Sequence, residues 1–264
     1  MNKLLLHDFT ATKQTRHYSK LKEELKEGEF LVILDFAENY SFVMQNAAQG
    51  FHWNNDQASL FPIVVYYRED GKLKNLSIVG ISDCLKHDTI AVYIFQRKLI
   101  DILKRKFPHI RKIIYYSDGA PQQFKNRKAF VNLCYHFLDF GVEAEWNFFA
   151  TAHGKGPCDG IGGTVKRYAA RASLQRGTAR PILTPLELFN WAQEAMDNIL
   201  FFYVEDKEYC ATQSLLEERF AKAITLKGTL KYHMIIPLIE SVGYVNVKTF
   251  SESEKIKSMR VIKS

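Results

Sequence analysis

Three aspartates lie in settings that favour chemistry with metal ions. Asp35 interrupts the apolar run "FLVILDF", Asp118 follows the apolar run "IIYYS", and Asp159 lies in the glycine-rich stretch "HGKGPCDGIGG". Asp is disfavoured within strands, and an ionised carboxylate is costly to bury unpaired. Carboxylate oxygens suit Mg²⁺ or Mn²⁺, and two such ions ~3.5–4 Å apart stabilise both the attacking and the leaving oxygen of a phosphodiester. We therefore treat the three acids as candidate metal ligands and catalytic residues.

Each of these acids also has a structural explanation that the sequence leaves open. Asp35 could pair with an arginine or cap a turn, "SDGAP" around Asp118 is a turn signal, and Asp159 could cap the helix that follows it. Two further acids compete for a role: Glu38 as an assistant to Asp35, and Asp88 as an alternative ligand.

The elements that must position these acids follow from apolar periodicity and turn signals. Gly71, between Asp70 and Lys72, predicts a hairpin turn between two antiparallel strands. Gly141 and Thr184 mark the end and the start of two helices. The predicted strands are 30–36, 41–46, 60–70, 72–83, 110–118 and 142–151. The predicted helices are 12–27, 88–106, 122–141, a helix that has Asp159 in its first turn and runs to about residue 174, and 184–200.

This order predicts an α/β fold of the RNase H-like type, with a five-stranded mixed sheet flanked by helices. The strands that precede Asp35 and Asp118 are then neighbours, and sites of open α/β sheets lie at the carboxyl ends of such strands. We predict an N-terminal helical extension (1–28), a catalytic core (29–180) and a helical and β C-terminal extension (181–264) packed on that core.

Glycines and cations surround the third acid. Gly160, Gly162 and Gly163 each cost about 1 kcal/mol relative to Ala inside a helix. Their lack of side chains would let a phosphate backbone approach the site, or let the helix pack tightly on the sheet. Five nearby residues are candidate contacts to nucleic acid, with a loop histidine and a solvated basic face as the alternative: His153, Lys155, Lys166, Arg167 and Arg171.

Composition bounds the function classes. The 264 residues carry a net charge of +7, which favours a polyanionic partner such as DNA. The four cysteines form no CxxC pair, which indicates reduced thiols inside the cell, and no apolar run approaches the ~18 residues that would span a membrane. The glycine-rich stretch matches no P-loop and no dinucleotide fingerprint. We expect no small-molecule cofactor, no membrane contact, and a nuclear or cytoplasmic location.

The blocks "VILDFAENYS", "IIYYSDGAPQQFKN" and "HGKGPCDGIGGTVKR" together resemble the catalytic domain of DDE/D-type transposases and integrases, in the retroviral integrase superfamily. The resemblance covers roughly residues 30–176 and is shared with transposon-derived proteins of animal genomes. It implies that Asp35, Asp118 and Asp159 form the metal-binding triad of a strand-transfer enzyme that works on DNA as a multimer. A third Asp in place of Glu would make this a DDD site.

The sequence thus predicts metal-dependent cleavage and strand transfer of DNA, with two Mg²⁺ or Mn²⁺ ions. Two alternatives remain open at this stage. One is a nuclease of the same fold that joins nothing, and the other is a domesticated, non-catalytic module that binds nucleic acid or protein.

Overall fold

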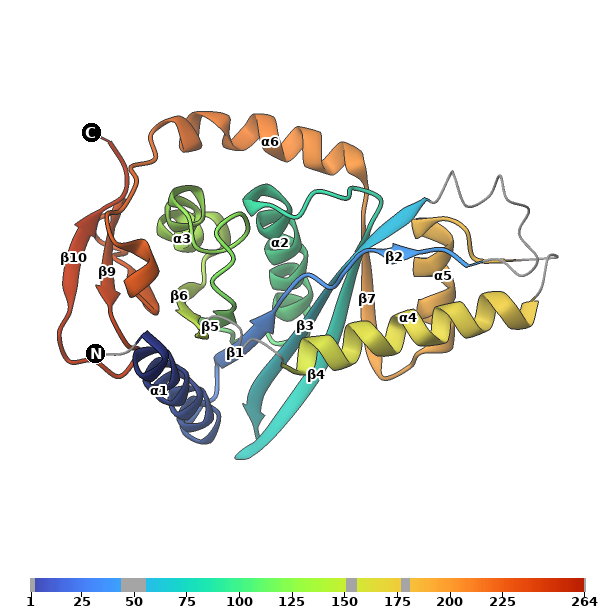
Figure 1. The fold of residues 1–264 in the computed structure, drawn as a ribbon, viewed down its shortest axis with the longest axis horizontal. Coiled ribbons are helices and arrows are strands. Elements are labelled where there is room, and N and C mark those ends of the chain that lie inside the picture. Colours follow the sequence, from blue (N-terminus) through green and yellow to red (C-terminus); the bar gives the residue numbers. More distant parts are fainter. Residues whose placement is uncertain (1–2, 44–55, 151–155, 177–180, 264) are drawn as a thin grey trace.

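A computed structural model describes residues 3–43, 56–150, 156–176 and 181–263. One large mixed β-sheet runs through the molecule, with helices on both faces (Figure 1). Within these residues, no helix is long and apolar enough to cross a membrane.

The five central strands have the order that the sequence predicts. β1 is antiparallel to β3 and parallel to β5, β3 is antiparallel to β4, and β5 is parallel to β6. In space the strands follow the order β4-β3-β1-β5-β6. Their bounds are β1 (Glu29–Leu34), β3 (Gln57–Glu69), β4 (Lys72–Ser82), β5 (Lys112–Ser117) and β6 (Glu143–Phe148).

The sheet is larger than the five-stranded sheet that the sequence predicts. β7 (Ile199–Val204) adds beside β4, and β8 (Met234–Pro237) adds beside β6, followed by β9 (Tyr244–Lys248) and β10 (Lys257–Arg260). β2 (Tyr40–Ser41) pairs with β3, which brings the total to ten strands in the part of the chain that the structure describes. The C-terminal extension therefore continues the central sheet at both of its ends.

Two helix predictions need correction. The predicted helix 184–200 is too long: α5 (Pro185–Ala195) ends early, and the apolar run from Ile199 forms β7, hydrogen-bonded parallel to β4. The N-terminal helix is longer than predicted, because α1 spans Lys3–Glu24. Good helix formers extend toward the N-terminus beyond the polar segment that signalled it.

The helices divide between the two faces of the sheet. α2 (Thr89–Lys106) and α3 (Arg127–Phe140) pack on one face, and α6 (Asp206–Ala221) lies across them as an outer layer (Figure 1). α1, α4 (Pro157–Arg176) and α5 cover the other face. Alternate residues of β1 accordingly face opposite cores: Val32 lies with α2 and α3, whereas Ile33 lies with α1 and the start of α4.

Several predicted boundaries are confirmed by their backbone angles or local hydrogen bonds. Asp70 and Gly71 both have positive φ, 52° and 71°, as a tight hairpin turn requires. Gly141 closes α3 in the left-handed conformation, with φ 61°. Thr184 forms a full capping box with Glu187 at the start of α5.

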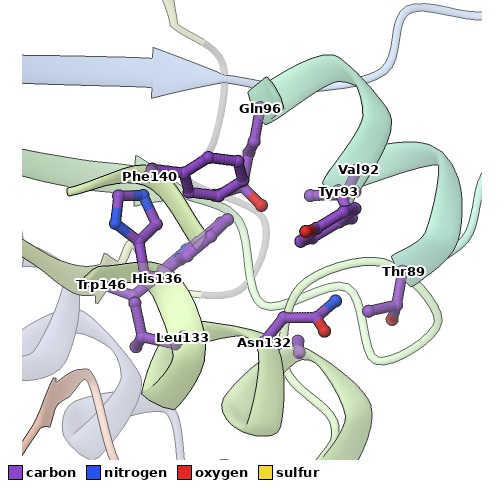
Figure 2. Close-up of a pocket in the computed structure, with 10 residues that line it drawn as sticks. Thr89, Val92, Tyr93, Gln96, Asn132, Leu133, His136, Phe140 and Trp146 are labelled. Atoms are coloured by element: carbon purple, nitrogen blue, oxygen red, sulfur yellow. The ribbon is translucent and has the colours of Figure 1, made fainter. Parts of the chain in front are cut away.

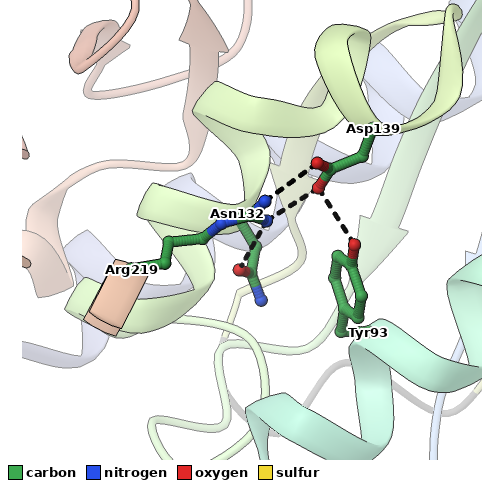
Figure 3. A network of polar contacts seen from close by, with 4 residues as sticks. All are labelled: Tyr93, Asn132, Asp139 and Arg219. Carbon is green, nitrogen blue, oxygen red and sulfur yellow. Dashed lines mark hydrogen bonds and ion pairs between the residues drawn. The ribbon is translucent and has the colours of Figure 1, made fainter. Parts of the chain in front are cut away.

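A polar network links α6 to α2 and α3. The Arg219 guanidinium donates to both oxygens of Asp139 at 2.7 and 2.8 Å, and the Tyr93 hydroxyl donates to the same carboxylate at 3.0 Å (Figure 3). Asn132 accepts a longer bond from Arg219 at 3.5 Å. Arg219 and Asp139 are both mostly buried, at 18% and 16% exposed, so this pair links α2, α3 and α6 in a low-dielectric setting.

Candidate active site

Two of the three aspartates lie level with each other at one edge of the sheet. β1 and β5 are parallel, with Ile33 opposite Tyr116, and two residues further along each strand are Asp35 and Asp118. The strand register therefore sets these two acids side by side at the carboxyl ends of β1 and β5.

The third aspartate reaches the same edge through the start of α4. Asp159 lies in the first turn of that helix. The neighbouring Cys158 is buried, and its thiol donates to the carbonyl of Ile33, two residues before Asp35, at 3.5 Å. This contact places the beginning of α4 against the end of β1.

The electrostatics of Asp35 report on all three acids together. The pKa of Asp35 is raised to about 7, first by burial and then by the negative charges of Asp118 and Asp159, while the Phe36 N–H opposes the shift. Burial, followed by the negative charges of Asp35 and Asp159, also raises the pKa of the Cys158 thiol. Like charges shift a pKa in this way only at short range, so the three predicted acids share one electrostatic environment.

Each carboxylate at present accepts a backbone hydrogen bond close to its own residue. Asp35 accepts from the Phe36 N–H at 2.8 Å, Asp118 from Ala120 at 2.9 Å, and Asp159 from Gly156 at 3.2 Å. Among the described residues, no three His, Cys, Asp or Glu side chains form a ready-made metal cluster. The donor set fits hard divalent cations, because it consists of carboxylate oxygens whose mutual repulsion a cation would relieve.

Asp118 is held in place by residues that the sequence did not single out. The Trp146 indole N–H donates to the Ser117 hydroxyl at 2.9 Å, and that hydroxyl donates to the carbonyl of Asp118 at 2.8 Å. Trp146 lies on β6, directly beside β5. The only signal in the sequence is an aromatic residue at an inward position of an alternating strand, which is equally typical of any core.

The glycines of α4 have different roles. A Cβ at Gly162 would lie 3.1 Å from both Ala37 and Pro62, so this glycine allows the helix to pack closely on the sheet. A Cβ at Gly160 would meet nothing within 4 Å. Of the two explanations that the sequence left open, tight packing holds at Gly162, whereas Gly160 leaves open space beside Asp159.

The predicted basic residues fall into two groups. Lys166, Arg167 and Arg171 lie on α4, downstream of Asp159; Arg167 and Arg171 are exposed, and Lys166 approaches Glu38 at 4.0 Å. His153 and Lys155 lie outside the described residues. The helix that carries Lys166, Arg167 and Arg171 therefore begins at the three acids.

The two competing acids have other settings. Asp88 caps α2, where it accepts from the N–H groups of Ile90 and Ala91 at 3.0 Å each, and it also accepts from the Tyr209 hydroxyl at 2.6 Å. Glu38 is 97% exposed. Asp88 is therefore a structural cap, and neither residue contributes to the shifted pKa of Asp35.

A closed cavity lies elsewhere, between α2 and α3 (Figure 2). Its volume is about 10 Å³, which is room for roughly one water molecule. None of the three aspartates lines it. The lining residues are Thr89, Val92, Tyr93, Gln96, Ala129, Asn132, Leu133, His136, Phe140 and Trp146.

Comparisons with known proteins give a family. No curated protein matches the chain. Among solved structures, endonuclease V of Ciona intestinalis in complex with inosine-containing DNA matches with 8% identity and a TM-score of 0.23, over 64% of this chain and 68% of that one. NurA matches with 11% identity and a TM-score of 0.13, over 97% of this chain and 52% of that one. Such scores are too low to equate the folds. The family model described as "Domain of unknown function (DUF8701)" matches residues 14–251, and the chain belongs to that family.

Proposed function

We propose that this chain is a metal-dependent polynucleotidyl transferase of the transposase and integrase type, which cleaves DNA and transfers strands. The observation that carries the proposal is that the register of β1 and β5 and the contact of Cys158 with Ile33 bring Asp35, Asp118 and Asp159 to one edge of the sheet. The pKa of Asp35, raised by burial and by the charges of the other two acids, agrees with this arrangement. A partly buried acid with a raised pKa, beside other carboxylates at one sheet edge, is typical of functional sites. A set of acids kept only for stability would be arranged to avoid this repulsion.

The setting of the acids supports the same proposal. The strand order β4-β3-β1-β5-β6 is the arrangement that an RNase H-like assignment requires. The acids follow β1, follow β5 and begin α4, which is the distribution expected for a triad of that fold.

Asp35, Asp118 and Asp159 would hold two Mg²⁺ or Mn²⁺ ions through their carboxylate oxygens. Bound there, such ions supply charge stabilisation at the attacking and leaving oxygens of a phosphodiester. Burial and the neighbouring negative charges favour the protonated form of Asp35, and a bound cation would favour the ionised form.

The basic face of α4 would hold the DNA backbone. Arg167 and Arg171 lie four residues apart on one exposed helical face, and the open space at Gly160 allows a phosphate to approach Asp159. DNA as the substrate would place the protein in the nucleus, where we propose that it acts as a multimer.

Cleavage and joining assays test this proposal. The protein is incubated with Mn²⁺, a labelled oligonucleotide duplex and a target plasmid, and the wild type is compared with Asp118→Asn. We expect Asp118→Asn to lower the rates of both cleavage and joining at least 100-fold, because the substitution removes one of the three carboxylate ligands of the proposed metal site. Asp197→Asn, which changes an exposed acid before β7, should keep full activity. Cleavage without joined products would indicate a nuclease, and equal activity in Asp118→Asn would refute the metal site.

A second candidate is a non-catalytic module that binds nucleic acid. The backbone hydrogen bonds that now hold Asp118 and Asp159, and the lack of a ready-made cluster among the described residues, favour it. DNA binding that persists unchanged in Asp118→Asn, together with no cleavage by the wild type, would support this candidate.

A further inference from the structure

Lys125 is a buried lysine close to the candidate site. Its side chain is only 6% exposed, its ammonium donates to the carbonyl of Leu230 at 3.3 Å, and the same ammonium lies 4.8 Å from the centre of the Phe148 ring. Burial lowers the pKa of Lys125 to about 8. An apolar side chain of the same length would fill this space at less cost, so the charge itself calls for an explanation.

The stem of Lys125 supports the turn that carries Asp118. The carbonyl of Ala120 accepts bonds from the N–H groups of Gln123, Phe124 and Lys125 at 3.2, 2.9 and 3.2 Å, which closes the turn. The Cδ atom of Lys125 lies 3.5 Å from the Cβ position of Gly119, the residue next to Asp118. The side chain thus folds back beneath the candidate metal ligand.

The ammonium reaches two other segments from there. Phe148 ends β6 and pairs with Ser117, the residue before Asp118. Leu230 belongs to the short 3₁₀ helix η2 (Thr229–Lys231), which precedes β8 in the C-terminal extension. The η2 segment lies at the surface, with the Leu230 side chain 75% exposed.

We infer that Lys125 is a positioning residue of the candidate site: its ammonium ties the Asp118 turn to the Leu230 carbonyl, so that the C-terminal extension sets where the Asp118 carboxylate lies. The inference rests on the proposed function in that Asp118 is taken as a metal ligand. A hydrogen bond from a charged donor is stronger inside the protein than in water, which suits a tether between two segments 105 residues apart.

Lys125→Met tests the tether, since Met fills the space without the charge. Lys128→Met is a matched control. The Lys128 ammonium also lies over an aromatic ring, 5.1 Å from its centre, but that ring belongs to Phe220 of α6. Two readouts are compared: amide hydrogen exchange of residues 118–124 and 229–231, and the affinity for Mn²⁺ alone measured by calorimetry.

We expect Lys125→Met to speed exchange about tenfold in both segments, and to weaken Mn²⁺ binding about tenfold, as the loss of a group that orients a metal ligand does. Lys125→Arg should retain most of the wild-type exchange and Mn²⁺ affinity, and Lys128→Met should retain both. Unchanged exchange at 229–231 in Lys125→Met would overturn the tether, as would a lowered thermal stability with unaltered Mn²⁺ affinity.

The failure of this inference can be told apart from failure of the proposed function. If Asp118→Asn binds Mn²⁺ as tightly as the wild type, the proposed metal site fails, and the exchange measurements alone decide the tether. If Lys125→Met does not fold, the rate of proton exchange at the Lys125 ammonium of the wild type, measured from its ¹⁵N signal, tests the tether instead. Slow proton exchange at that ammonium supports the tether, and exchange as fast as at surface lysines overturns it.

Discussion

At the scale of single residues, the main finding is an acid that ionises only at a cost. The pKa of Asp35 is about 7 in the folded protein, against an ordinary value of 3.8. Below pH ~4 the carboxyl is protonated in both folded and unfolded chains, and it costs nothing. As the pH rises toward 7, the unfolded chain ionises first, so the folded state loses stability relative to it.

Asp35→Asn should therefore stabilise the protein in a pH-dependent manner. We expect the gain in unfolding free energy to be small near pH 4 and to reach its full value, on the order of 2–4 kcal/mol, above pH 7. Urea unfolding of both proteins at pH 4, 6 and 8 measures this difference. A gain that is the same at every pH would mean that the charge of Asp35 is not the cause.

At the scale of elements, the close packing of α4 on the sheet requires a glycine at position 162 but not at position 160. Gly162→Val should lower the unfolding free energy by about 1–3 kcal/mol, because the new side chain has no space beside Ala37 and Pro62. Gly160→Ala is the matched control and should raise it by roughly 0.5–1 kcal/mol, since the helix gains Ala in open space. Equal effects of the two substitutions would contradict this packing.

Elements with strong local signals were predictable from the sequence. The pairing of the two strands that end at Asp35 and Asp118 was predictable as well. The hairpin at Gly71, the end of α3 at Gly141 and the start of α5 at Thr184 all follow from turn and cap chemistry. β7 was not predictable, because periodicity does not separate a short apolar run from the end of a helix. Its strand state depends on a parallel partner, β4, more than 100 residues earlier.

The supports of the site were also beyond the sequence. Trp146, Ser117 and Lys125 acquire their roles through contacts between β5, β6 and η2. The contacts of Trp146 and Lys125 join residues far apart in the chain, and nothing in the types of these residues distinguishes them from an ordinary core aromatic, a strand serine or a surface lysine. The acids were candidates from the sequence because of their settings: Asp35 and Asp118 adjoin apolar runs, and Asp159 lies in a glycine-rich stretch. Their role as metal ligands stays a prediction.

At the scale of the whole molecule, α6 binds the outer layer to the two helices on the sheet. Arg219→Ala should lower the unfolding free energy by about 1–3 kcal/mol, because it leaves the mostly buried carboxylate of Asp139 without its charged donor. Lys207→Ala removes the exposed ion pair with Glu205, the residue that precedes α6, and should leave stability nearly unchanged because water and salt screen such pairs. Chemical denaturation of both variants compares them, and a larger loss in Lys207→Ala would contradict the role of the network.

The most direct measurement for the whole account is anomalous X-ray diffraction from crystals soaked in Mn²⁺. We predict manganese peaks bounded by Asp35, Asp118 and Asp159, with the Asp118 and Asp159 carboxylates turned away from the backbone groups that hold them now. Crystals of Asp118→Asn should lose at least one of these peaks. No manganese at this edge of the sheet, or three carboxylates too far apart to share ions ~3.5–4 Å from each other, would contradict the account.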